Sequence, residues 1–226
     1  MPVELLCVPG LGLEAAEWRA AGDAIGRRVG ARRTTLRPLP GYGLRPDVGD
    51  DLRPRALAER LVAELPERAV LLGHSASCQV VTRAAALAPG SVSALVLVGP
   101  TTDPRAASWP RLAARWLRTA AWERPHQVPV LARSYSRTGL GWMARAMEAA
   151  RREDVRADLR SLTCPVLVVR GRHDRICPED WSGHLASLAP DGSRAVTLAR
   201  GGHMVPLTHP DLLSDAVASW LRASGA

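Results

Sequence analysis

The sequence of 226 residues contains no lysine, no asparagine and no phenylalanine, and all 30 of its basic residues are arginine. These three missing residues have A/T-rich codons, so their joint absence indicates a GC-rich genome. Much of the formal net charge of +8 then reflects codon bias. A basic chain would ordinarily suggest a nucleic-acid partner. Here no recognition motif and no basic stripe outside residues 101–160 accompanies the charge, and we expect no nucleic-acid partner.

The chain also has few cysteines and no long apolar run. Its four cysteines, Cys7, Cys78, Cys164 and Cys177, form no C-x-x-C pair and no metal-ligand spacing. They predict reduced, buried thiols and no metal site. No run of about 20 apolar residues predicts a membrane span, and the N-terminus lacks the basic segment of a signal peptide. These absences favour a cytoplasmic protein.

What is present is an alternation of short apolar runs with longer Ala-, Leu- and Arg-rich segments of helical period. The predicted strands are residues 3–8, 33–37, 69–73, 94–98, 166–170 and 194–198, and the predicted helices are residues 14–29, 54–64, 77–88, 178–188 and 211–223. This order predicts an α/β fold with a parallel sheet and helices on both faces. Without a linker or a repeat, a chain of this length predicts a single domain, residues 1–226.

One interval breaks the alternation, because no strand pattern occurs between residues 101 and 163. Helical patterns lie around residues 111–121 and 141–160 and are interrupted near Pro125 and Pro129. We expect residues 101–160 to form a helical cap inserted between core segments 1–100 and 161–226. Such an insertion follows the fourth predicted strand and would cover the carboxyl edge of the sheet, where open α/β sheets bind ligands.

The segment "VLLGHSASCQVV" predicts a strand that turns sharply into a helix at Ser75. A nucleophilic serine is held in such a strained turn with its Oγ exposed. Strand and helix pass closely there, so the flanking positions must be small, and Gly73 and Ser77 are. The alternative is that Ser75 only caps the helix.

Two further polar residues follow predicted strands. His203, in "GGHMVP", comes after the last strand, and Asp174, in "VVRGRHDRICP", comes after the preceding one. A histidine there can act as a general base, and an acid can orient it. Asp103 is the competing acid, whereas His209 is expected to be structural. The chain order Ser75, Asp174, His203 is the order found in α/β-hydrolases.

An acyl-transfer site also needs backbone N–H donors for the oxyanion. The turn "VPGLGL" after the first strand can supply the N–H of Leu11, and the N–H of Ala76 follows the nucleophile. The alternative is that this Pro-Gly turn merely ends a strand.

Together these segments resemble the α/β-hydrolase family, and in particular its small members with a helical cap. "PGLGLEAAEW" resembles the family's oxyanion loop, "GHSAS" its nucleophile turn, "CPVLVVRGRHD" its acid segment and "GGHMVP" its histidine segment. Two departures are Pro9, where many members have His, and Ser77, which replaces the last Gly of the turn. The resemblance implies a wholly parallel sheet of about six strands.

The resemblance further implies a serine hydrolase that cleaves an ester, thioester or lactone through an acyl-enzyme on Ser75, with Asp174 and His203 completing the triad. It implies no metal and no organic cofactor. Serine as nucleophile argues against the epoxide hydrolases and haloalkane dehalogenases. Two alternatives stay open: the same triad used for C–C cleavage, acyl transfer or cyclisation, and a non-catalytic binding protein.

Specificity is expected to come from the cap and from residues beside the nucleophile. We expect four residues to contact substrate: Gly10, His74, Trp109 and Trp142. Residues 101–160 carry 12 Arg and 6 acidic residues, a net +6, and Arg111, Arg115 and Arg118 recur at helical spacing. These arginines form either a solvated stripe or a surface for an anionic acyl donor, such as one carried on an acyl carrier protein or coenzyme A. The oligomeric state is left open.

Overall fold

A computed structural model describes residues 3–225 of the chain. Its centre is a sheet of six parallel strands in the order β2-β1-β5-β6-β7-β8. The bounds are β1 Glu4–Val8, β2 Arg33–Leu36, β5 Ala69–His74, β6 Val92–Val98, β7 Val166–Gly171 and β8 Arg194–Leu198. The wholly parallel six-stranded sheet expected from the sequence is confirmed.

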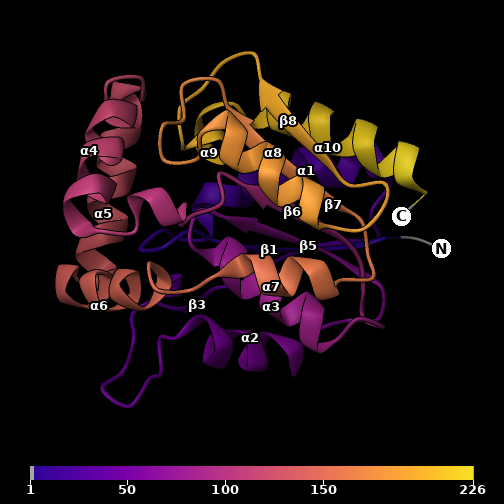
Figure 1. Cartoon of the computed structure of the whole chain (residues 1–226), viewed down its shortest axis with the longest axis horizontal. Helices are drawn as coiled ribbons and strands as arrows, with labels where there is room; N and C mark the ends of the chain where they lie inside the picture. The colour runs from indigo at the N-terminus through magenta and orange to yellow at the C-terminus, as the bar shows by residue number, and fades with distance from the viewer. Residues whose placement is uncertain (1–2, 226) are drawn as a thin grey trace.

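Helices cover both faces of the sheet because its strands are apolar on both sides (Figure 1). One face packs against α1 and α10, and the other packs against α2, α3, α7 and α8. Along β5, Leu71 faces the second group, whereas Val70 and Leu72 face the first. The helix bounds are α1 Ala16–Val29, α2 Pro54–Val62, α3 Ser77–Leu87, α8 Glu179–Leu188, α9 Val205–Thr208 and α10 Pro210–Ser224.

Only helices connect β6 to β7. They are η1 Pro104–Ala106, α4 Trp109–Ala120, η2 Pro125–Gln127, α5 Val128–Thr138, α6 Leu140–Ala150 and α7 Val155–Ser161. Figure 1 shows α4, α5 and α6 grouped at the end of the molecule opposite the N-terminus. By contrast, α7 packs against the core helices α3 and α8.

Three local features differ from the sequence expectation. Pro125 and Pro129 do not interrupt helices but lie in the first turns of η2 and α5, where proline is tolerated because its missing N–H would have no intrahelical acceptor. The helix predicted over residues 141–160 is two helices, and the Asp154 side chain caps the second by accepting from Arg156 N–H. A two-stranded sheet, β3 Leu39–Pro40 and β4 Gly43–Leu44, was not predicted.

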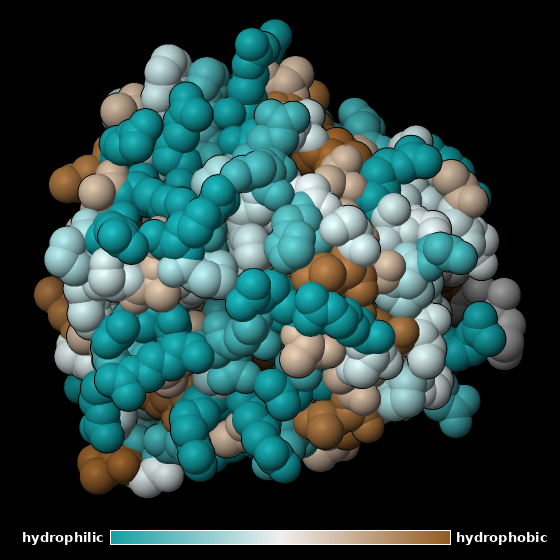
Figure 2. All heavy atoms as spheres, in the orientation of Figure 1, coloured by the Kyte–Doolittle hydropathy of each residue, from teal (hydrophilic) through white to brown (hydrophobic). Residues whose placement is uncertain are grey.

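Most of the surface seen in Figure 2 is hydrophilic, with hydrophobic side chains scattered over it. Several large exposed apolar side chains belong to the segment between β6 and β7: Trp109, Trp116, Leu117, Trp122, Val128, Val130 and Leu140. Within residues 3–225, no helix combines the length and apolar character needed to cross a bilayer.

Candidate active site

Ser75 occupies the sharp turn between β5 and α3. Its φ of 58° lies in the left-handed region, which a non-glycine residue adopts at a cost. The turn is anchored because Ser75 N–H donates to the Val98 carbonyl at 2.8 Å. A Cβ at Gly73 would lie 2.6 Å from a methyl group of Val81 and 3.2 Å from the Cys78 backbone, so only glycine fits there. The turn is strained as a nucleophile turn would be, and no side chain caps the N-terminus of α3 with a hydrogen bond.

Ser77 stands where the family usually has glycine, and its hydroxyl is fully used. Its Oγ accepts from His74 N–H at 2.9 Å and lies 2.9 Å from the His74 carbonyl oxygen and 3.1 Å from the Val8 carbonyl oxygen, either of which can accept its proton. The side chain is completely buried. The hydroxymethyl group therefore ties the turn to the end of β1 rather than obstructing it.

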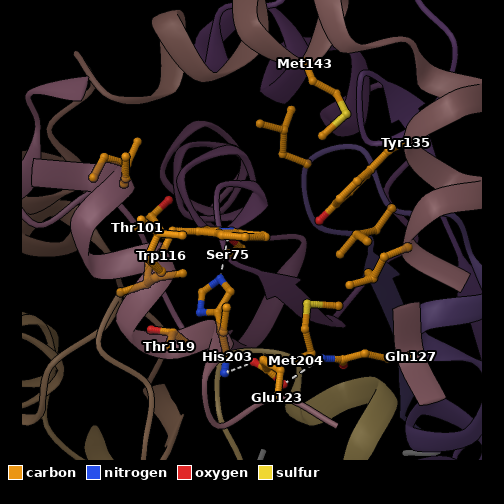
Figure 3. Close-up of a pocket in the computed structure, with 18 of the residues that line it drawn as sticks. Ser75, Thr101, Trp116, Thr119, Glu123, Gln127, Tyr135, Met143, His203 and Met204 are labelled. Carbon is orange, nitrogen blue, oxygen red and sulfur yellow. Dashed lines mark hydrogen bonds between the residues drawn. The ribbon is translucent and has the colours of Figure 1, made fainter. Parts of the chain in front are cut away.

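The ring of His203 lies between Ser75 and Asp174. Figure 3 shows its contact with Ser75. Its Nε2 is 2.8 Å from Ser75 Oγ and its Nδ1 is 2.8 Å from Asp174 Oδ2. The other oxygen of Asp174 accepts from the N–H groups of Ile176 and Cys177. The pKa of Asp174 is lowered, because its hydrogen-bonded contact with His203 outweighs the upward effect of burial. A carboxylate therefore faces Nδ1, which donates, and leaves Nε2 to accept the Ser75 proton.

Asp103 and His209, the other acid and histidine considered for the triad, form contacts outside it. Asp103 forms ion pairs with Arg105 and Arg115, and no contact joins it to His203. The pKa of Asp103 is lowered because these arginines outweigh its burial. The ring of His209 contacts Thr208 and Arg124, consistent with the expected structural role.

The expected oxyanion donors belong to Leu11, which lines the same cavity as Ser75, and to Ala76, which follows Ser75 in the chain. Within residues 3–225, no hydrogen-bond acceptor takes the N–H of Leu11 or of Ala76. The backbone of Gly10, beside Leu11, packs closely on the ring of His74, because a Cβ at Gly10 would lie 2.8 Å from Nδ1 of that ring. Two backbone donors are thus left free on the loops that meet at the serine.

A cavity of about 680 Å³ opens above Ser75 and His203, and most of its wall is apolar. The apolar side chains come chiefly from the segment between β6 and β7: Trp109, Leu112, Trp116, Leu117, Val128, Leu131, Met143 and Met147. Of the four residues expected to contact substrate, Trp109 and His74 line this cavity, whereas Gly10 and Trp142 do not. Trp142 instead packs partly buried against the core and under Arg145.

Sequence reasoning missed two carboxylates that hold the site together. Glu123, between α4 and η2, accepts from the backbone N–H groups of His203 and Met204. Glu17, in α1, accepts from Gly10 N–H at 2.8 Å and contacts His74. Glu123 belongs to no motif, whereas Glu17 lies in the segment "PGLGLEAAEW", whose pattern predicted only an oxyanion loop. Among residues 3–225 no cluster of metal-binding side chains occurs.

The cysteines are free and buried. Burial raises the pKa of the Cys164 thiol to about 11 and raises those of Cys7, Cys78 and Cys177 as well. These thiols are therefore poor nucleophiles near neutral pH, and none of the four cysteines lines the cavity beside Ser75.

Proteins related in sequence are esterases. The pimeloyl-[acyl-carrier protein] methyl ester esterase of Methylococcus capsulatus is 25% identical, over 98% of this chain and 95% of that protein. The enzyme of the same name from Pectobacterium atrosepticum is 26% identical, over 97% of this chain and 94% of that protein.

Solved structures share the fold. A hydrolase from Oleispira antarctica has a TM-score of 0.77 at 14% identity and covers 98% of this chain and 91% of its own. A thermophilic esterase from Thermogutta terrifontis has a TM-score of 0.73 at 22% identity, over 100% of this chain and 92% of its own. A family model described as "Alpha/beta hydrolase family" matches residues 5–216. With nearly its whole length matched, the chain belongs to the alpha/beta hydrolase family.

Proposed function

We propose that this protein is a serine hydrolase that cleaves carboxylic esters through an acyl-enzyme on Ser75. One observation carries the proposal: Ser75 Oγ, the His203 ring and Asp174 are joined by two contacts of 2.8 Å beneath an apolar cavity. The strained turn at Ser75, with its positive φ, supports the proposal independently.

In the proposed reaction, His203 Nε2 takes the Ser75 proton while Oγ attacks the ester carbonyl carbon. The N–H groups of Leu11 and Ala76 bind the oxygen that becomes negative. When the tetrahedral intermediate collapses, the ester C–O bond breaks and His203 returns the proton to the leaving alcohol. Water, deprotonated by His203, then attacks the acyl-enzyme and releases the carboxylic acid, and Ser75 regains its proton.

We infer that α4, α5 and α6, within residues 101–160, cap this site in a single domain and select the substrate, whereas α7 belongs to the core. The side chains of α4, α5 and α6 that line the cavity are mainly Trp, Leu, Val and Met. Such a wall favours an extended apolar acyl or alkyl group over a short or charged one. Trp109 would contact this group. The same apolar surroundings would exclude water from Ser75 while the acyl-enzyme forms.

An acyl group delivered by an acidic carrier protein is a more specific candidate. The names of the two esterases above refer to an acyl-carrier-protein substrate, and α4 exposes Arg111 and Arg118. Arg115 is less available for a partner because it pairs with Asp103 at 2.7 Å. Reversing the charge of Arg111 and Arg118 should raise KM for a carrier-bound ester and leave a neutral free ester unaffected. If the charge-reversed variant and the native protein have the same KM for the carrier-bound ester, these arginines form only a solvated stripe.

Labelling with a fluorophosphonate, followed by intact mass, tests the proposed function. We expect a single adduct on the native protein, none on Ser75→Ala, and slow formation on His203→Ala. A folded native protein that forms no adduct would contradict the proposal and favour a non-catalytic binding role. With reactivity established, p-nitrophenyl esters of increasing acyl length should show kcat/KM rising from acetate to longer chains.

A further inference from the structure

A second buried ionisable pair, Glu17 and His74, lies directly behind the proposed triad. Glu17 projects from α1 and is only 3% exposed, and His74, the last residue of β5, is completely buried. Oε1 of Glu17 contacts Nδ1 of His74, and Oε2 accepts from Gly10 N–H at 2.8 Å. Burying two ionisable groups is costly unless they are paired. The pair therefore needs an explanation beyond packing.

The opposite side of the His74 ring faces the histidine loop. Its Nε2 lies 2.9 Å from the backbone carbonyl oxygen of His203, and the two rings are 4.9 Å apart between centroids. A carbonyl oxygen only accepts hydrogen bonds, and so does the Glu17 carboxylate. Both ring nitrogens of His74 thus face acceptors, which is the arrangement that suits a doubly protonated imidazolium.

The charges around His74 agree with this protonation state. Burial lowers the pKa of His74, but the Glu17 carboxylate, the His203 carbonyl and, more distantly, Asp174 raise it, and the pKa lies above its usual value. The ring of His203 lies beside that of His74 and is a second ionisable group in contact with it. With Glu17 and Asp174 nearby, the positive ring has two carboxylates to balance it.

These contacts connect the three segments that a serine hydrolase must align. Gly10 precedes Leu11, a proposed oxyanion donor; His74 precedes Ser75; and His203 is the proposed base. Hydrogen bonds from Gly10 N–H to Glu17, and from His74 to the His203 carbonyl, close a chain through all three. A shift in either bond would move a donor or the base relative to Ser75.

We propose that Glu17 and His74 form a buried ion pair that positions the oxyanion loop and the His203 loop around Ser75, with His74 held as an imidazolium. The inference rests on the proposed hydrolase function, in which these loops carry the reacting groups. Neither residue touches the substrate carbonyl; both are positioning residues. A misplacement of the order of 1 Å in such a site costs up to about 100-fold in rate, so loss of the pair should be far more visible in catalysis than in binding.

Two substitutions of His74 separate its two contacts. Asparagine places its amide near the position of Nδ1, so His74→Asn keeps a donor for Glu17 and loses the contact with the His203 carbonyl. Glutamine reaches the position of Nε2, so His74→Gln keeps the second contact and loses the first. We expect fluorophosphonate to label His74→Gln faster than His74→Asn. We expect His74→Asn to have the higher unfolding free energy of the two variants. A purely structural role predicts that labelling rate follows stability.

Glu17→Gln tests the charge. It keeps an acceptor for Gly10 N–H but removes the negative partner of His74, and we expect kcat for a p-nitrophenyl ester to fall about 10- to 100-fold with a smaller change in KM. Ser214→Ala is the matched control, because Ser214 is also buried, lies in α10, and donates its hydroxyl to the Asp211 carbonyl rather than to any group of the proposed site. It should leave kcat unchanged.

Histidine-selective ¹⁵N NMR of the native protein reads the protonation state directly, with the His74 signal assigned by its loss in His74→Asn. We expect both ring nitrogens of His74 to carry protons at neutral pH. A neutral His74 ring, or labelling rates that follow stability across the variants, would overturn the inference while leaving the hydrolase function intact. A native protein that is not labelled at all would instead count against the proposed function.

Discussion

The carboxylate of Glu123 accepts hydrogen bonds from the backbone N–H groups of His203 and Met204, at 2.5 and 3.0 Å. Glu123 lies between α4 and η2, so this contact joins the segment that lines the cavity to the loop that bears the proposed base. Gly202 permits the approach, because a Cβ there would lie 2.5 Å from a Glu123 oxygen. The shape of the cavity and the placement of His203 are therefore coupled.

Replacing Glu123 with alanine should impair catalysis through the position of His203. Two backbone N–H groups lose a charged acceptor, and the loop is freed to shift away from Ser75. We expect kcat/KM for a p-nitrophenyl ester to fall about 10-fold or more. Glu153→Ala is a suitable control, because Glu153 pairs with Arg83 and not with the histidine loop. Equal kinetics for the two variants would show that the contact is dispensable.

Substitution of the two candidate triad acids, Asp174 and Asp103, should have different effects on kcat and on the unfolding free energy. Asp174→Asn removes the charge that orients His203 and should lower kcat by roughly 10³- to 10⁴-fold. Asp103→Asn should leave kcat within a few-fold but lower the unfolding free energy, because Arg105 and Arg115 lose their partner. Steady-state kinetics and urea unfolding of both variants test this. A large kcat loss in Asp103→Asn alone would reverse the assignment.

Ser77 should matter for stability more than for chemistry. Ser77→Ala leaves the buried His74 N–H without its acceptor, which should cost about 1–3 kcal/mol of unfolding free energy. The exposed Ser187, whose hydroxyl bonds the His184 carbonyl, provides the comparison through Ser187→Ala. If both variants unfold at the same urea concentration, the Ser77 hydroxyl is not a structural tie.

Narrowing the cavity should change the preferred acyl length. Ala113 and its neighbour Ala114 are both exposed, but only Ala113 of the two lines the cavity. Ala113→Trp should therefore raise KM for long-chain esters and spare acetate esters, while Ala114→Trp should alter neither. The measurement is kcat/KM across a series of acyl lengths. An unchanged series for Ala113→Trp would mean that the acyl chain lies elsewhere.

The buried pair should make stability depend on pH in a specific direction. The pKa of His74 is raised above 6.5 in the folded protein, so the folded state holds the proton more tightly than the unfolded chain does. Its stabilising contribution is complete below pH 6.5 and is lost as pH rises through the folded pKa. The difference in unfolding free energy between the native protein and His74→Gln should therefore shrink as the pH rises from 6.5 into the alkaline range. A constant difference would indicate that His74 does not titrate in this range.

Much of the fold follows from local pattern. Strand-length apolar runs, such as residues 94–98 and 166–170, can be buried on both faces only in a parallel sheet covered by helices. The requirement for small residues around Ser75 is also local, and it identified the turn. The segment between β6 and β7 was harder, because Pro125 and Pro129 were interpreted as interruptions when each lies in a first turn.

The sequence by itself determined the strand order along the chain, the turn at Ser75, and the positions of His203 and Asp174 after strands, because these depend on residues close together in the chain. Only the tertiary structure decided which groups meet. Glu123 contacts His203, which lies 80 residues further along the chain. The ring of His74 contacts the backbone carbonyl of His203, which lies 129 residues further along. Such contacts depend on how helices pack on the sheet, and no local preference specifies them. For the same reason the packing, and not composition, separates Trp109 on the cavity wall from Trp142 against the core.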